Sequence, residues 1–193
     1  RSVSRGLGDV YKRQVEFLVR HEKVDGLAFI GSTAAAKSLK MLGVEHNTKV
    51  QALGGAKNHM IVLPDADLDM SADAAVSASF GAAGQRCMAV SVVVAVGDIA
   101  DELLDKIKER MPNLVMGVTD DDKTQLGPVI SPENKDRIYS FIDSAEPDGA
   151  TLVVDGRIRS NSLEGCFVGP TLIDNVKPCL LYTSDAADDL WCV

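Results

Sequence analysis

The chain has 193 residues, 46% hydrophobic and 25% charged, which suits one globular domain or parts of two. A net charge of −8 without a Lys/Arg cluster, together with only 5% aromatic residues, argues against a nucleic-acid partner. No apolar run is long enough to span a membrane, and the four cysteines (87, 166, 179 and 192) lack metal-ligand spacing, so we expect free thiols in a reducing, cytoplasmic compartment.

The first regular pattern predicts a strand, a helix and a second strand joined by short links. The strands are expected over residues 24–30 and 48–53, and the helix over residues 34–41 with Gly43 as its C-terminal cap. Links this short make the strands parallel with a right-handed crossover.

The turn between that strand and helix contains Gly31 and Ser32. Free N–H groups and the positive end of the helix dipole suit a phosphate there. The same two residues would also serve as a helix cap without any ligand.

A second strand–helix pattern leads to a cysteine. After the apolar run 60–63, Pro64 and Asp67 predict the start of a helix over residues 68–79. The remaining predicted elements are a strand at 88–96, an amphipathic helix at 99–111, a helix capped by Ser131, a strand at 151–154, a polar loop at 157–162 and a strand at 166–173 interrupted at Gly169–Pro170. The fold class is therefore α/β throughout.

Cys87 ends a Gly-rich run and directly follows Arg86. A thiol reacts as its thiolate, which a neighbouring cation or backbone N–H groups favour. Gly81 and Gly84 allow close approach of the backbone to a bound group. The alternative is a buried, inert cysteine.

Three blocks of sequence resemble the aldehyde dehydrogenase superfamily, and most of all its CoA-acylating methylmalonate-semialdehyde dehydrogenase branch. They are Phe29–Thr33 (FIGST), Val50–Asp69 (VQALGGAKNHMIVLPDADLD) and Gly84–Ala89 (GQRCMA). The resemblance runs from about residue 15 to about residue 178. It implies an aldehyde-dehydrogenase-like fold, with the end of a Rossmann-type NAD-binding domain at 15–50 and part of the α/β catalytic domain at 51–178.

The resemblance also implies the site. Cys87 would be the catalytic nucleophile, Arg86 would bind the carboxylate of the substrate, and Gly31, Ser32 and Gly54 would contact NAD. Arg86 could instead stabilise the thiolate or form a structural ion pair. Gly31, Ser32 and Gly54 could be required only for the backbone geometry of their turns. A homodimer or homotetramer acting on a small aldehyde is expected.

Ala52 distinguishes two kinds of enzyme within the superfamily. Hydrolytic members resemble this chain around Leu53–Gly55 but carry a glutamate at the position of Ala52, where it activates water. A methyl group cannot accept a proton, so the acyl group should pass to coenzyme A, unless another carboxylate serves. The product would be propionyl-CoA or acetyl-CoA.

Residues 1–14 and 179–193 do not match the resemblance, and we expect them to be a non-native leader and tail. The front of the cofactor domain and further catalytic-domain strands would then be missing, leaving this chain by itself inactive. Two other interpretations remain open at this point, a hydrolytic aldehyde dehydrogenase and a dinucleotide-binding α/β fragment without chemistry.

Overall fold

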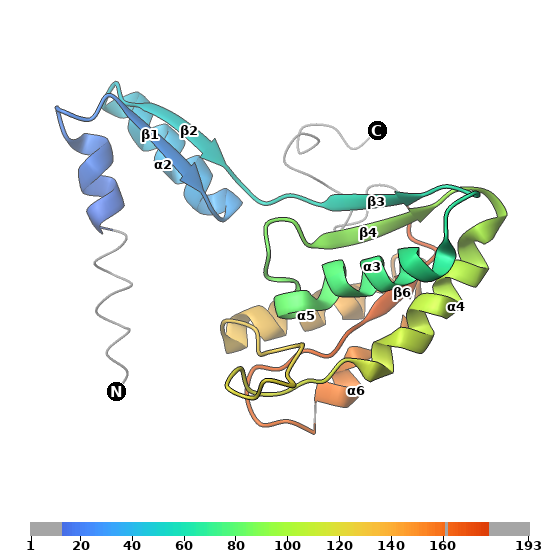
Figure 1. Cartoon of the computed structure of the whole chain (residues 1–193). Coiled ribbons are helices and arrows are strands. Elements are labelled where there is room, and N and C mark those ends of the chain that lie inside the picture. The colour runs from blue at the N-terminus through green and yellow to red at the C-terminus, as the bar shows by residue number, and fades with distance from the viewer. Residues whose placement is uncertain (1–12, 161, 178–193) are drawn as a thin grey trace. The chain divides into compact units, whose positions relative to one another are not determined.

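The structure, a computed structural model, describes residues 13–160 and 162–177 (Figure 1). The two expected terminal segments therefore lie almost entirely outside the described residues. The chain divides into two units between Ala56 and Lys57. No helix in the described ranges is both long and apolar enough to cross a membrane.

The first unit is a parallel βαβ unit, as predicted. Residues 13–20 are helical, and β1 (Gly26–Ile30), α2 (Thr33–Glu45) and β2 (Lys49–Leu53) follow. The two strands pair in parallel from Gly26 opposite Lys49 to Ile30 opposite Leu53. A boundary between residues 50 and 51, as expected from the resemblance, would divide β2.

The prediction that Gly43 ends the helix was wrong. Gly43 is buried inside α2, and the helix continues to Glu45 with His46 as its C-cap. A Cβ at position 43 would collide with the side chain of Val50 and lie 2.8 Å from the Thr48 carbonyl oxygen. The glycine therefore allows α2 to approach β2 closely, and tertiary packing outweighs its local tendency to end a helix.

The second unit opens with another parallel βαβ arrangement, formed by β3 (Asn58–Val62), α3 (Leu68–Phe80) and β4 (Val90–Ala95). The carboxylate of Asp67 accepts a hydrogen bond from the Met70 N–H at 3.0 Å, which confirms the predicted N-terminus of α3. A short 3₁₀ turn, η1 (Gly81–Gly84), follows the helix and leads to Cys87.

In the described residues, the rest of the second unit adds three α-helices, two short 3₁₀ helices and a two-stranded antiparallel sheet. In chain order the elements are η2 (Gly97–Ile99), α4 (Ala100–Arg110), η3 (Met111–Asn113), α5 (Pro132–Ala145), β5 (Thr151–Val154), α6 (Gly156–Ser160) and β6 (Leu172–Asp174). The hydroxyl of Ser131 caps α5 by accepting from the Asn134 N–H, as predicted.

Two predictions near the end of the second unit were wrong. The first four residues of the expected polar loop, 157–160, belong to the helix α6, and β6 begins only at Leu172. Ser160 explains both, because its buried hydroxyl donates to the Gly156 carbonyl at 2.9 Å and accepts from the Gly169 N–H at 2.7 Å. The Gly169 N–H is thus used by a side chain and cannot join a strand ladder.

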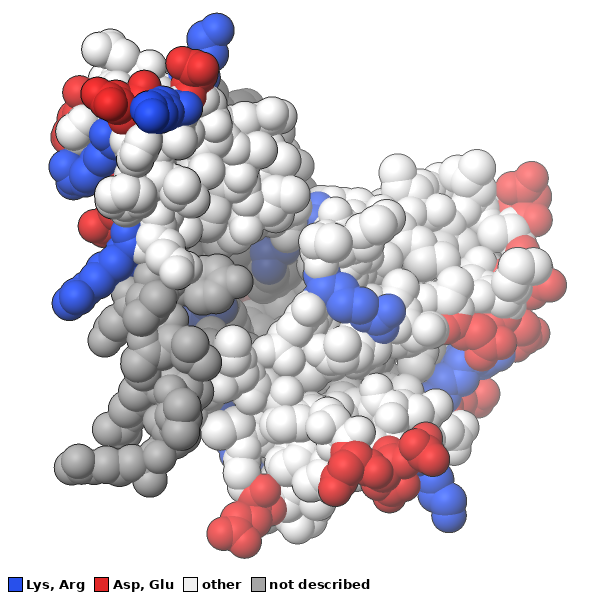
Figure 2. All heavy atoms as spheres, turned by 60° about the vertical axis from the view of Figure 1, so that its left-hand side comes forward, with Lys and Arg blue, Asp and Glu red and all other residues white. Residues whose placement is uncertain are grey.

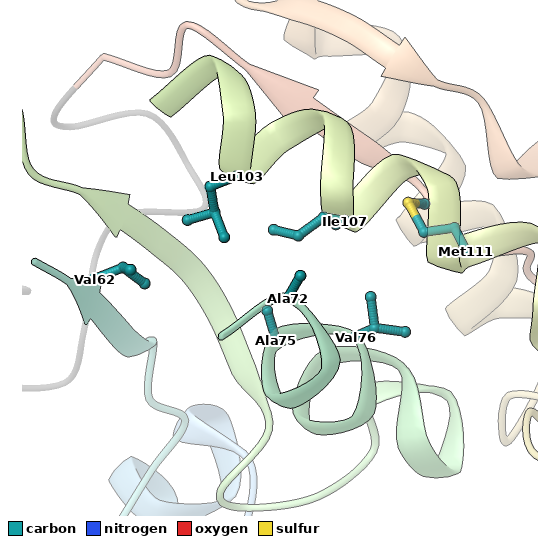
Figure 3. Close-up of a cluster of buried hydrophobic side chains, with 7 residues drawn as sticks. All are labelled: Val62, Ala72, Ala75, Val76, Leu103, Ile107 and Met111. Atoms are coloured by element: carbon teal, nitrogen blue, oxygen red, sulfur yellow. The ribbon is translucent and has the colours of Figure 1, made fainter. Parts of the chain in front are cut away.

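The core of the second unit lies between α3, α4 and the strand β3 (Figure 3). Its buried members are Val62, Ala72, Ala75, Val76, Leu103, Ile107 and Met111. Alanines on α3 let α4 approach closely. Outside the core, Lys106 and Arg110 of α4 form ion pairs with Asp69 of α3, and Arg110 also pairs with Asp73.

Candidate active site

The turn before α2 has the features of a phosphate-binding helix N-terminus. The Gly31 N–H donates to the Leu53 carbonyl at 3.1 Å, which extends the β1–β2 pairing by one residue. Ser32 is the N-cap of α2, and its hydroxyl accepts from the Ala35 N–H at 3.4 Å. The first turn of α2 carries no acidic residue that would repel an anion.

Gly54 lies against the same helix terminus. A Cβ at position 54 would lie 2.9 Å from the hydroxyl oxygen of Thr33, the first residue of α2. That hydroxyl accepts from the Gly55 N–H at 3.1 Å and so ties the end of β2 to the start of α2. The structure therefore brings Gly31, Ser32 and Gly54 together, and it adds Thr33, which the sequence reasoning missed.

Ala52 lies in β2, half-buried and opposite Phe29 of β1. Its methyl group has no acceptor for a proton. Ala52 itself therefore cannot serve as a general base for water.

Cys87 lies in the second unit, in a tight turn between η1 and β4. The turn is closed by the Ala89 N–H, which donates to the Arg86 carbonyl at 3.1 Å. Cys87 is exposed and its thiol is free, so the expected alternative of a buried cysteine is wrong as to burial. Such exposure is what a nucleophile needs to reach an outside carbonyl carbon.

Two side-chain amides hold this turn, and neither was singled out from the sequence. Asn58 Nδ2 donates to the carbonyls of Cys87 and Ala89, at 2.9 and 3.0 Å. Gln85 Nε2 donates to the Pro128 carbonyl at 3.2 Å, and its Oε1 accepts from the Ile130 N–H at 3.0 Å. These partners are 29 to 45 residues apart in sequence, so no local pattern could have revealed them.

Arg86 makes contacts that the sequence did not suggest. Its Nε donates to the Gly81 carbonyl at 3.0 Å and its Nη2 to the Ser77 carbonyl at 3.1 Å, so the guanidinium caps the end of α3. These bonds use two of the five N–H donors of the guanidinium. The remaining donors include the end-on pair, one N–H of Nη1 and the second N–H of Nη2, which has the fork geometry that a carboxylate requires. Within residues 13–160 and 162–177, Arg86 forms no ion pair.

The backbone before the cysteine is strained. Ala82 and Ala83 both have φ of 53°, in the left-handed region that residues with a Cβ rarely occupy. Gly84 continues at a φ of 70°. Conformations of this kind persist only where surrounding contacts hold them, and the bonds from Arg86 and Gln85 are such contacts.

Lys57 and His59 flank Asn58 in the chain. The His59 ring nitrogen Nδ1 lies 3.0 Å from the Lys57 carbonyl oxygen, within hydrogen-bond distance. Burial lowers the pKa of the Lys57 ammonium, and the positive charge of Arg137 lowers it further.

Comparison with known proteins agrees with the sequence blocks. The aldehyde dehydrogenase family matches residues 9–184, which reaches a little further at each end than the resemblance did. Malonate-semialdehyde dehydrogenase 3 of Geobacillus kaustophilus (strain HTA426) is 46% identical over 169 residues, covering 87% of this chain and 35% of that protein.

Solved structures give the same result. The crystal structure of a methylmalonate-semialdehyde dehydrogenase from Oceanimonas doudoroffii matches with a TM-score of 0.83 at 43% identity, covering 89% of this chain and 36% of that one. A betaine aldehyde dehydrogenase from Staphylococcus aureus, solved in complex with NAD⁺, matches at a TM-score of 0.81 and 28% identity, covering 88% and 34%. The chain thus spans about a third of the length of these relatives, and by its sequence blocks, its α/β architecture and its cysteine turn it belongs to the aldehyde dehydrogenase family.

Proposed function

We propose that the protein to which this chain belongs is a CoA-acylating, NAD-dependent dehydrogenase of methylmalonate or malonate semialdehyde. The observation that carries the proposal is an exposed Cys87 in a turn fixed by Asn58 and Gln85, directly after Arg86. The names of the relatives support the choice of substrate, because semialdehyde dehydrogenases are 43–46% identical to this chain in the two comparisons given.

The cysteine begins the chemistry. The Cys87 thiolate attacks the aldehyde carbon, a C–S bond forms, and the carbonyl π electrons move to oxygen to give a thiohemiacetal. The backbone N–H of Cys87 is a candidate donor to that oxyanion. Loss of hydride from the thiohemiacetal then leaves a thioester on Cys87.

The hydride acceptor would be NAD, which supplies the redox chemistry when bound. Gly31, Ser32, Thr33 and Gly54 would hold it. A Ser-capped helix N-terminus with no acidic residue in its first turn fits a pyrophosphate group, and the missing Cβ at Gly54 leaves the approach along Thr33 open.

Arg86 would select for a substrate with a free carboxylate. The end-on edge of its guanidinium remains available while the other donors hold the end of α3. A fixed guanidinium next in sequence to the nucleophile favours short dicarboxylic semialdehydes over neutral aldehydes.

Ala52 directs the thioester to coenzyme A. Without a proton acceptor at this position, water is not activated, and the thiol of coenzyme A attacks the thioester and releases Cys87. Loss of CO₂ from the acyl group would give propionyl-CoA from methylmalonate semialdehyde or acetyl-CoA from malonate semialdehyde.

We also propose a reducing, cytoplasmic setting and a homodimer or homotetramer for the complete protein. The thiols of Cys87 and Cys166 are both free, as a reducing compartment favours. On the face in Figure 2, Lys and Arg side chains and Asp and Glu side chains both occur among the described residues.

A hybrid enzyme tests the function. The aligned 169-residue segment of the Geobacillus kaustophilus relative would be replaced by the matching part of this chain. With semialdehyde and NAD⁺ we expect a burst of NADH close to one per Cys87, then slow turnover until coenzyme A is added. Cys87→Ser should abolish the burst. Fast turnover without coenzyme A, or activity that survives Cys87→Ser, would contradict the proposal.

A further inference from the structure

Asn58 stands where two strands begin side by side. It is the first residue of β3 and lies opposite Val90, the first residue of β4, with an irregularity in the pairing immediately after it. The chain that enters β4 comes directly from the cysteine turn. A side chain at this position can therefore reach the backbone of that turn.

The amide nitrogen of Asn58 is fully committed to the turn. Its two Nδ2 hydrogens match two acceptors, the carbonyl oxygens of Cys87 at 2.9 Å and Ala89 at 3.0 Å. The Arg86 carbonyl already accepts from the Ala89 N–H. Three of the carbonyls between residues 86 and 89 are thus fixed by a donor.

We propose that Asn58 is a positioning residue for the nucleophile, an inference that rests on the proposed role of Cys87. By holding the Cys87 and Ala89 carbonyl oxygens, Asn58 prevents them from turning toward the sulfur. The negative ends of two peptide dipoles turned toward the sulfur would oppose the negative charge of a nucleophilic thiolate. The same two bonds also fix the cysteine backbone in one geometry.

The test measures thiol alkylation on the chain as it exists, without cofactor or substrate. The rate of iodoacetamide labelling at Cys87 is followed by peptide mass spectrometry from pH 6 to pH 10 or so, with Cys166 as an internal reference. The variant is Asn58→Leu, which is uncharged, of similar shape, and has no donor. The matched control is Asn134→Leu, since Asn134 is also half-buried and donates through Nδ2, to the Ser131 hydroxyl at 3.2 Å.

In Asn58→Leu, we expect labelling of Cys87 to slow about threefold near pH 7 and less at the alkaline end of the range, while labelling of Cys166 keeps its rate. Arg86 is the charged neighbour in the turn and is unchanged in every variant, so it does not contribute to the difference. Asn134→Leu should leave both profiles as in the unmodified chain.

Two outcomes overturn the proposal. The first is an unchanged Cys87 profile in an Asn58→Leu chain whose circular dichroism matches the parent. The second applies even if that variant does not fold: in the unmodified chain, the side-chain amide hydrogens of Asn58 should exchange with solvent more slowly than those of Asn134, and equal rates would show that the two bonds do not hold. Failure of dehydrogenase activity in a hybrid enzyme affects neither readout.

Discussion

At the scale of single residues, Arg86 combines observed structural contacts with a proposed substrate contact. Its contacts with Gly81 and Ser77 hold the end of α3, while its end-on edge would bind a substrate carboxylate. In the hybrid enzyme, we expect Arg86→Leu to raise KM at least tenfold for malonate semialdehyde and much less for propanal. Steady-state kinetics with the two aldehydes measures this, and an equal loss for both would assign Arg86 to the loop or the thiolate instead.

The sequence identified site residues by type and motif but missed those that act through backbone contacts. Cys87, Arg86 and the turn at Gly31 follow from short motifs whose residues are adjacent in the chain. Asn58 and Gln85 hold the turn through side chain–backbone bonds that close only when β3, β4 and the 128–130 segment are placed in space. A single amide side chain has no local sequence signature for such a bond.

At the scale of elements, Gly43 shows packing that overrides helix propensity. Gly43→Ala would gain about 1 kcal/mol in propensity, but its Cβ would lie 2.8 Å from the Thr48 carbonyl oxygen and meet the Val50 side chain. Overpacking of this kind costs about 1–3 kcal/mol, so we expect net destabilisation of the first unit. Amide hydrogen exchange measures this destabilisation, and we expect faster exchange at Leu39 and Val50 in Gly43→Ala than in the parent.

Gly55→Ala is the control for that experiment. A Cβ there would meet only the Thr33 hydroxyl oxygen at 3.5 Å, an ordinary contact, and the N–H that binds Thr33 is retained. Exchange in α2 and β2 should stay close to that of the parent. Faster exchange in both variants would mean that any added methyl disturbs the unit and that Gly43 is not special.

The contact between α3 and α4 depends on pH through Asp69. Hydrogen bonds from Lys106 and then from Arg110 lower the pKa of the Asp69 carboxyl below its ordinary value. Because the pKa of Asp69 is lower in the folded state than in the unfolded state, the ionised carboxylate stabilises the fold at pH values above the unfolded-state pKa. This stabilisation is lost as the pH falls through the pKa of the folded state. We therefore expect acid destabilisation of the parent below about pH 4, and a flatter acid limb in Asp69→Asn.

Thermal unfolding from pH 2 to pH 7 measures this difference. Asp65→Asn is a suitable control, because Asp65 is exposed and forms no ion pair within the described ranges. Its acid limb should follow that of the parent. Because Asp69 is also exposed, added salt should shrink the difference between parent and Asp69→Asn, and a difference that persists unchanged at high salt would contradict the electrostatic account.

Most elements could be predicted because their signals are local. Apolar runs gave the strands of both βαβ arrangements, and Asp67 and Ser131 gave helix starts that the structure confirms. The errors at α6 and β6 have one cause, the close contact of Gly156 with Gly169 and the two hydrogen bonds of Ser160. Such a contact between segments is a product of the fold and leaves no periodic pattern.

At the scale of the whole molecule, the same βαβ arrangement occurs in each unit, and a different part of the proposed site lies in each. In the first unit, the link from β1 into α2 holds Gly31 and Ser32, two of the residues proposed for NAD. In the second, the return link from α3 to β4 holds Cys87. In each unit the sheet supplies a rigid frame and the functional residues lie in a connection, which is where binding and catalytic groups commonly occur.

The last prediction concerns the fate of the acyl group in the complete enzyme. In the hybrid, Ala52→Glu places a carboxylate where hydrolytic members of the superfamily carry their base. We expect turnover without coenzyme A to rise at least tenfold, because a carboxylate can activate water against the thioester on Cys87. The product should change from acyl-CoA to free acid, as chromatography of the reaction mixture would show. Ala52→Gln is the control, since it adds similar bulk but no base, and it should leave hydrolysis slow. If Ala52→Gln raised hydrolysis as much as Ala52→Glu, the effect would come from altered access of water, and position 52 would not decide between the two reactions.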